Sequence, residues 1–204
     1  MNLKLKRIYT GRFYAVAVLT LLLYIFLAHE TPPVFCEPAG SEESGKWLTI
    51  ESGHLLIEYE NSVNLKTVAR RLNKRGLISS GFFSSDDVLA STPENRVAQI
   101  VDRLLRRAEE ILDMYPPNLK LTIKIFNTEG SLKEEYFRMF GAHRDYEAFY
   151  AHQYRTIYTS EYSISDSVII HEMAHAVVDT YFSVKPPPKV SEVLATYVDV
   201  HLED

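Results

Sequence analysis

The chain has 204 residues, 46% hydrophobic and 24% charged, a composition typical of a globular protein and not of a disordered one. The formal net charge is -5 and the globular part carries no basic stripe, which argues against nucleic acid as a partner. Cys36 is the single cysteine, which excludes an intramolecular disulfide and a thiolate-rich metal site. Any metal ion would therefore have to be bound by His, Asp and Glu.

The first 28 residues predict an export signal. Four basic residues precede an uncharged, mostly apolar run at 13–28: Lys4, Lys6, Arg7 and Arg12. The run is shorter than the roughly 20 residues of a spanning helix, but Phe26 breaks the small-x-small pattern of a cleavage site. Segment 1–28 is thus either a signal peptide or a membrane anchor, and the membrane is a partner only if it is uncleaved. The basic end favours an extracytoplasmic domain.

Residues 29–46 are rich in Pro, Gly, Ser and Glu and are typical of a linker, so the folded domain is expected at 47–204. The segment WLTIESGHLLIEYE at its start predicts two short strands around a Ser-Gly turn. An amphipathic helix is expected at 62–76, because one face is apolar and the rest carries Arg and Lys.

The clearest helix begins with Thr92 as its cap and Pro93 in the first turn, and it ends before a Pro-Pro pair. The alternation in LKLTIKIF, 119–126, predicts a strand with one solvent-exposed face. Ser131, with Glu134 in capping-box spacing, predicts a short helix. One or two further strands are expected within residues 147 to 160. Helices between few, short strands favour the α+β class, with a small mixed sheet packed on helices, over α/β.

The stretch SVIIHEMAHAVVDTYF raises the question of function. Ser163 and Asp166 are in capping-box spacing, so a helix is expected from about residue 164 to Tyr181. His171 and His175 are 400° apart on this helix, which places both imidazoles on one face, one turn apart. Two neutral imidazoles at that spacing can hold one Zn²⁺ ion.

Glu172, next to the first histidine, would lie beside such an ion without binding it, in the position of a general base. The rest of the helix is apolar nearly all round, and a buried His or Glu without a partner is costly. That cost disfavours the alternative, in which these are satisfied polar groups on a core helix.

A third ligand is expected from the stretch SEVLATYVDVHLED, which predicts a second helix with Ser191 as its cap. This helix can return antiparallel across the KPPPK loop, so Glu192 in its first turn is the candidate. The alternative is an ordinary glutamate favoured by the helix dipole. Two histidines and a glutamate leave one zinc position open, as in catalytic sites, whereas structural zinc has four protein ligands.

HEMAH and, after sixteen residues, Glu192 within SEVLATYVD resemble the gluzincin metallopeptidases. The closer resemblance is to the peptidase MA-like and minigluzincin type, with a second helix similar to that of aminopeptidase N-type enzymes. It implies a minimal zincin-like domain with one zinc ion per chain, bound by His171, His175 and Glu192. Glu172 would be the catalytic general base.

The resemblance also implies roles for residues around the ligands. Asp199 matches the acid seven positions after the family's glutamate and would hold a ligand histidine in its tautomer, and Asp179 is a second candidate for that role. Tyr197 and His201 are candidates for lining the cleft. The string GAHRD at 141–145 lacks the Met-Glu pair that anchors a substrate amine, so exopeptidase activity is not indicated.

The expected activity is zinc-dependent hydrolysis of peptide bonds in peptide or protein substrates, with Glu172 moving the proton. Substrate is expected to lie extended along RTIYTS, residues 155–160, by strand addition. The alternative function is a catalytically inactive zinc-binding protein that serves as a membrane-associated binding module. The presence of Glu172 favours catalysis over this alternative. The oligomeric state is not indicated.

Overall fold

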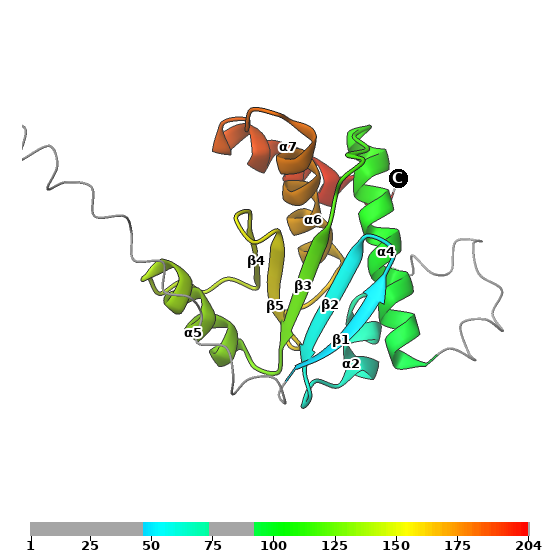
Figure 1. The fold of residues 1–204 in the computed structure, drawn as a ribbon, viewed down its shortest axis with the longest axis vertical. Coiled ribbons are helices and arrows are strands. Elements are labelled where there is room, and N and C mark those ends of the chain that lie inside the picture. Colours follow the sequence, from blue (N-terminus) through cyan, green and yellow to red (C-terminus); the bar gives the residue numbers. More distant parts are fainter. Residues whose placement is uncertain (1–46, 74–91, 204) are drawn as a thin grey trace, which may run out of the picture. The chain divides into compact units, whose positions relative to one another are not determined.

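The computed structural model describes residues 47–73 and 92–203, and the structural statements that follow concern these residues (Figure 1). The predicted export signal and linker, residues 1–46, lie outside the described residues. Among the described helices, none is both long and apolar enough to cross a membrane. The fold belongs to the α+β class: a five-stranded mixed sheet packs against helices on both faces.

The sheet has the strand order β1-β2-β3-β5-β4. The strands are β1 Trp47–Ser52, β2 Leu55–Glu60, β3 Leu121–Phe126, β4 Ala148–Ala151 and β5 Thr156–Ser160. Strands β2, β3 and β5 are parallel, whereas β1 pairs with β2 and β4 pairs with β5 in antiparallel fashion. β5 is therefore an interior strand, and β1 and β4 are the two edges of the sheet.

The predicted hairpin is confirmed, and residues 147 to 160, where one or two strands are predicted, contain two, β4 and β5. In the first hairpin, Ser52 pairs with Leu55, which leaves Gly53 and His54 as a two-residue turn. Gly53 adopts a φ of +53°, in the left-handed region where a side chain is strained. The glycine in the Ser-Gly pair is thus the residue that lets the chain reverse here.

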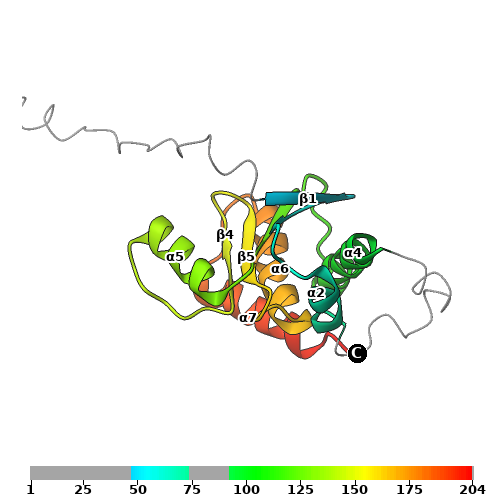
Figure 2. The same ribbon diagram turned by 90° about the horizontal axis from the view of Figure 1, so that it is seen from below.

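Five helices are described: α2 Leu65–Arg71, α4 Pro93–Leu112, α5 Glu129–Phe140, α6 Asp166–Tyr181 and α7 Pro188–Val200. α4 and α6 lie on one face of the sheet and α5 on the other (Figure 2). The prediction for α4 is confirmed, since the Thr92 side chain accepts a bond from the amide of Asn95 and Pro93 is the first helical residue. α2 is shorter than predicted and is capped by Asn64.

The main core lies between the sheet and the helices α4 and α6. Ile57, Ile123 and Ile157 stand side by side on the three parallel strands and are fully buried. Burying one such side chain contributes about 1.5–3 kcal/mol. A second, smaller cluster lies under α5 on the other face and includes Phe126, Leu132, Phe149 and Tyr158. The main core holds α6 against the sheet, and this fixes the histidines carried by that helix.

The capping residues predicted for α5 and α6 are wrong. Thr128, not Ser131, caps α5 and accepts a bond from the Ser131 amide at 3.0 Å. Ser165, not Ser163, caps α6 and accepts a bond from the Val168 amide at 3.3 Å. Both caps have the extended backbone that an N-cap requires. Sequence spacing alone could not show which of two nearby hydroxyl residues adopts that backbone.

The predicted start of α7 is also wrong. The helix begins at Pro188, and no side chain of the residues that the structure describes caps it. Proline suits the first helical position because its φ is already helical and its missing N–H needs no acceptor there. Ser191 therefore lies inside the helix, where its side chain is available for another contact.

Candidate metal centre

α6 carries the two histidines and is packed against helices and strands on several sides. It contacts α4, α7, β4 and β5, and half of its sixteen residues are buried. α7 packs mainly on α6, and Figure 1 shows the two helices side by side. This packing lets a side chain of α7 meet the polar positions of α6.

The three predicted metal ligands come together. His171 Nε2 lies 3.6 Å from Glu192 Oε2, and His175 Nε2 lies 3.6 Å from Glu192 Oε1. One possible ligand atom from each residue lies within 4.8 Å of the others, so the group could hold a metal ion. Ligand atoms bound tetrahedrally to zinc at about 2.0–2.1 Å would stand roughly 3.3 Å apart. The observed spacing fits an ion with a small adjustment of side chains.

The ligands differ in their exposure to solvent. The side chain of His175 is 15% exposed and that of His171 28%, whereas the side chain of Glu192 is 64% exposed. The histidines are therefore held by surrounding protein, and the glutamate reaches them from a solvent-exposed position. His171 and Glu192 are thus both partly accessible to solvent, as an open coordination position requires.

Ser191 is a site residue for which sequence analysis predicted only a capping role. Its hydroxyl lies 2.9 Å from His175 Nδ1, while Nε2 of the same ring faces Glu192. A proton on Nδ1 that is donated to Ser191 Oγ leaves the lone pair on Nε2 for a metal ion. Burial lowers the pKa of His175, an effect that Glu192 opposes, so the buried ring favours the neutral form that binds metals.

Glu172 lies beside the histidines in a mostly buried position. Desolvation raises the pKa of its carboxyl group to about 7, against a hydrogen bond from the backbone N–H of Tyr150 that lowers it. The carboxylate of Glu192 adds to the rise. A carboxyl group with a pKa near 7 can accept and release a proton at neutral pH. Tyr150 belongs to the edge strand β4, so this edge of the sheet lies next to the carboxyl group.

The two aspartates proposed to orient a ligand histidine have other contacts. Asp199 accepts a short hydrogen bond from Ser167 Oγ. Asp179 accepts a bond from the Tyr150 hydroxyl at 3.3 Å and pairs with Lys185 at 2.8 Å. The contact that the structure gives to a ligand histidine is that of Ser191, so the serine takes the position predicted for an acid.

Tyr197 and His201, predicted as possible cleft residues, pack ring on ring with centroids 4.0 Å apart. Tyr197 follows Glu192 by five residues, which rotates it by about 140° around the helix axis. Its side chain is half exposed on the side of α7 away from the buried face. The helix geometry thus directs Tyr197 away from the space between the histidines and Glu192.

The predicted substrate strand, RTIYTS, is wrong. Its strand, β5, has β3 on one side and β4 on the other, so its backbone groups are already paired. Among the described strands, the neighbouring edge strand β4 pairs with β5 alone. Strand addition near the metal centre would therefore have to use β4, which also carries Tyr150.

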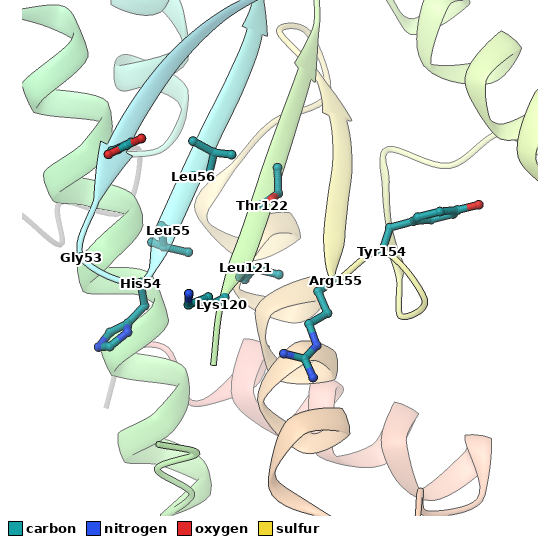
Figure 3. A pocket seen from close by; sticks show the side chains of 10 residues that line it. Gly53, His54, Leu55, Leu56, Lys120, Leu121, Thr122, Tyr154 and Arg155 are labelled. Atoms are coloured by element: carbon teal, nitrogen blue, oxygen red, sulfur yellow. The ribbon is translucent and has the colours of Figure 1, made fainter. Parts of the chain in front are cut away.

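A pocket of about 470 Å³ lies elsewhere on the sheet, between the β1–β2 turn and the β4–β5 turn (Figure 3). Exposed basic side chains line it, including those of Lys120 and Arg155, over a floor that includes Leu56 and Thr122. None of its lining residues belongs to the predicted site. The pocket therefore adds nothing to the metal centre.

Sequence analysis did not predict the contact of the Tyr150 amide with Glu172 or the contact of Ser191 with His175. Tyr150 precedes the helix by a whole strand, and only the packing of β4 against α6 brings its amide to Glu172. Ser191 stands directly before Glu192, and only its position within α7 turns it toward His175. Comparisons of the chain with protein-family models, curated proteins and solved structures found no match.

Proposed function

We propose that this protein is a zinc-dependent peptidase built on a minimal zincin-like domain. The observation that carries the proposal is the convergence of His171, His175 and Glu192, each of which brings one possible ligand atom to within 4.8 Å of the others. Three protein ligands leave one zinc position open for water or substrate, which is the arrangement of catalytic zinc. Glu172 stands next to these ligands with its carboxyl group held by the edge strand.

Zinc at this site would lower the pKa of water and polarise a carbonyl group. The remaining chemistry belongs to the chain itself. The Glu172 carboxylate would accept a proton from the attacking water and return it to the leaving amine. The Tyr150 amide would hold that carboxylate in place, and a proton shared between His175 Nδ1 and Ser191 Oγ would leave Nε2 free for the ion.

The proposed substrate is a peptide or an unfolded protein segment bound in extended form along β4. An edge strand offers unpaired backbone groups that an incoming strand can bind. Because Tyr150 of β4 bonds to Glu172, a segment pairing with β4 would run past the proposed general base. Specificity would then depend on the side chains that flank this edge.

The proposed location is outside the cytoplasm, with the domain either exported or anchored to the membrane by segment 1–28. This part of the proposal depends on the sequence pattern of the N-terminus, which lies outside the described residues. The alternative function is an inactive zinc-binding module associated with the membrane. It would need the three ligands but no base at Glu172.

The experiment compares the wild-type chain with Glu172→Gln in hydrolysis of an unfolded protein such as casein, with zinc content measured on the same samples. We expect both chains to bind zinc and Glu172→Gln to lose at least ~100-fold in rate, the typical contribution of a positioned general base. Glu134→Gln is the matched control, since Glu134 is exposed on α5. Equal hydrolysis by wild type and Glu172→Gln would refute the assignment, and zinc binding without hydrolysis would favour the inactive module.

A further inference from the structure

α7 carries an apolar face that the described part of the chain does not cover. Its members are Val190, Val193, Tyr197 and Val200, exposed by 46%, 67%, 48% and 68%. We call these four residues the outer stripe. Their spacing of three, four and three residues is that of a coiled-coil seam.

The outer stripe lies opposite the face that packs on α6. Ala195 and Val198 are fully buried on that inner face. Val193 and Tyr197 are each two residues away from Ala195, about 160° around the helix on either side. A helix that is apolar on both faces is normally covered on both, and a contiguous exposed apolar surface marks an interaction site.

We propose that the outer stripe is covered by a second copy of this chain, whose α7 packs antiparallel across a two-fold axis. A two-fold pairing is self-complementary, so one apolar stripe serves both partners. In this arrangement Val190 of one copy faces Val200 of the other, and Val193 faces Tyr197. The proposal adds an assembly to the proposed function and does not depend on it.

The exposed apolar area of the outer stripe is large enough to favour a second copy of the chain as its partner. The exposed parts of the outer stripe amount to about 400 Å² per chain, from the exposures given above. A standard interface buries about 800 Å² per partner, of which roughly 56–65% is apolar. The outer stripe therefore supplies most of the apolar centre of such an interface, and the polar flanks of α7 would supply its rim.

The charges along α7 favour the antiparallel orientation. Lys189 lies in the first turn and is exposed, and the last turn of α7 carries no basic residue. Antiparallel pairing brings Lys189 of each copy toward the carboxyl end of the other α7, where the helix dipole is negative. Parallel pairing would instead bring like charges together.

The pairing would leave the metal centre accessible. Glu192 lies about 60° from Ala195 around the helix, nearer the inner face than the outer stripe. The histidines stand on α6 behind it. Assembly through the outer stripe would thus present two separate metal centres that face away from the shared helix pair.

Cysteine cross-linking tests the pairing and its orientation in the full chain. With Cys36→Ser as background, Val190→Cys and Val200→Cys chains are mixed and oxidised. We expect a disulfide between the two different chains and none in Val190→Cys alone. Two Val190 positions in an antiparallel pair are offset by about ten residues, roughly 15 Å, beyond the ~7 Å limit for a bridge. A disulfide in Val190→Cys alone would indicate parallel pairing and overturn the proposal.

Mass measurement of the full chain in a mild detergent tests the contact itself. We expect a dimer for the wild type and a monomer for Val193→Glu, which places a carboxylate in the centre of the seam. Tyr115→Glu is the matched control, because Tyr115 is 58% exposed outside α7, and it should remain a dimer. An unchanged far-ultraviolet circular dichroism spectrum of Val193→Glu would show that the chain is folded.

A monomeric wild-type chain would overturn the proposal. If, in addition, lipid vesicles alone protect a Val193→Cys thiol from maleimide, the outer stripe belongs on a lipid surface. A dimer that persists in Val193→Glu would place the contact elsewhere and would overturn the proposal as well.

Discussion

α6 and α7 both supply ligands to the candidate metal centre, but they are held in different ways. α6 packs against the sheet, α4 and α7, and its ligand side chains are mostly buried. α7 packs mainly on α6 and carries a ligand whose side chain is 64% exposed. The structure thus combines two candidate ligands on a helix packed into the core with a third on a helix that packs mainly on one side.

This difference indicates that packing alone positions the helix that carries the two histidines, whereas the position of Glu192 would depend more on a bound ion. Packing of α6 against α4, α7 and the sheet positions the backbone that carries His171 and His175. Glu192 depends on the position of α7, so a bound ion would link the two helices and stabilise the weaker contact. Metal binding should therefore change α7 more than α6.

Removing a histidine should have the largest effect. His175→Ala deletes a ligand and the partner of Ser191, and we expect zinc affinity to fall about 100- to 1000-fold. That range corresponds to about a quarter of the 10–16 kcal/mol with which proteins bind structural zinc through four ligands. Competition titration with a chelating dye measures the change. His152→Ala, at an exposed position in the β4–β5 turn, is the control and should bind zinc normally.

Metal removal should change the hydrogen-exchange rates of α6 and α7 to different extents. After chelation by EDTA, we expect faster hydrogen exchange at the amides of α7, on the order of tenfold, with little change in α6. Hydrogen-exchange mass spectrometry of the full chain with and without zinc measures both helices in one experiment. Equal acceleration in α6 and α7 would mean that the histidine helix is no better fixed by the core than the glutamate helix.

Ser191→Ala should have the smallest of these effects. Loss of a group that orients a ligand histidine typically weakens metal binding 10- to 100-fold, and we expect the lower end because the partner is a neutral hydroxyl. Ser167→Ala is the matched control, since this serine bonds Asp199 and not a histidine. If Ser167→Ala weakened zinc binding more than Ser191→Ala, the acid predicted from sequence would be the true orienting group.

Sequence patterns predicted the features that depend on local chemistry. The cap and proline at the start of α4 and the alternation of β3 follow from neighbouring residues, and the structure confirms both. The spacing of His171 and His175 follows from the helical repeat alone. Glu192 was a candidate because a short loop returns the chain toward α6, and the two helices do meet.

Features that depend on long-range packing could not be read from the sequence. β5 is an interior strand because β3 pairs with it in parallel across the long α5 connection, and no local signal marks that pairing. Ser163 and Ser165 are equally suitable caps by residue type, and backbone conformation decides between them. The contact of Ser191 with His175 requires the relative rotation of α6 and α7, which a single sequence does not specify.

The most direct test of the metal centre is zinc content together with zinc X-ray absorption on the full chain. We predict one zinc ion per chain with two imidazole nitrogens and carboxylate oxygen at about 2.0–2.2 Å, and loss of the carboxylate contribution in Glu192→Ala. A folded chain without zinc, or a spectrum with sulfur at about 2.3 Å from Cys36, would contradict the three-ligand site.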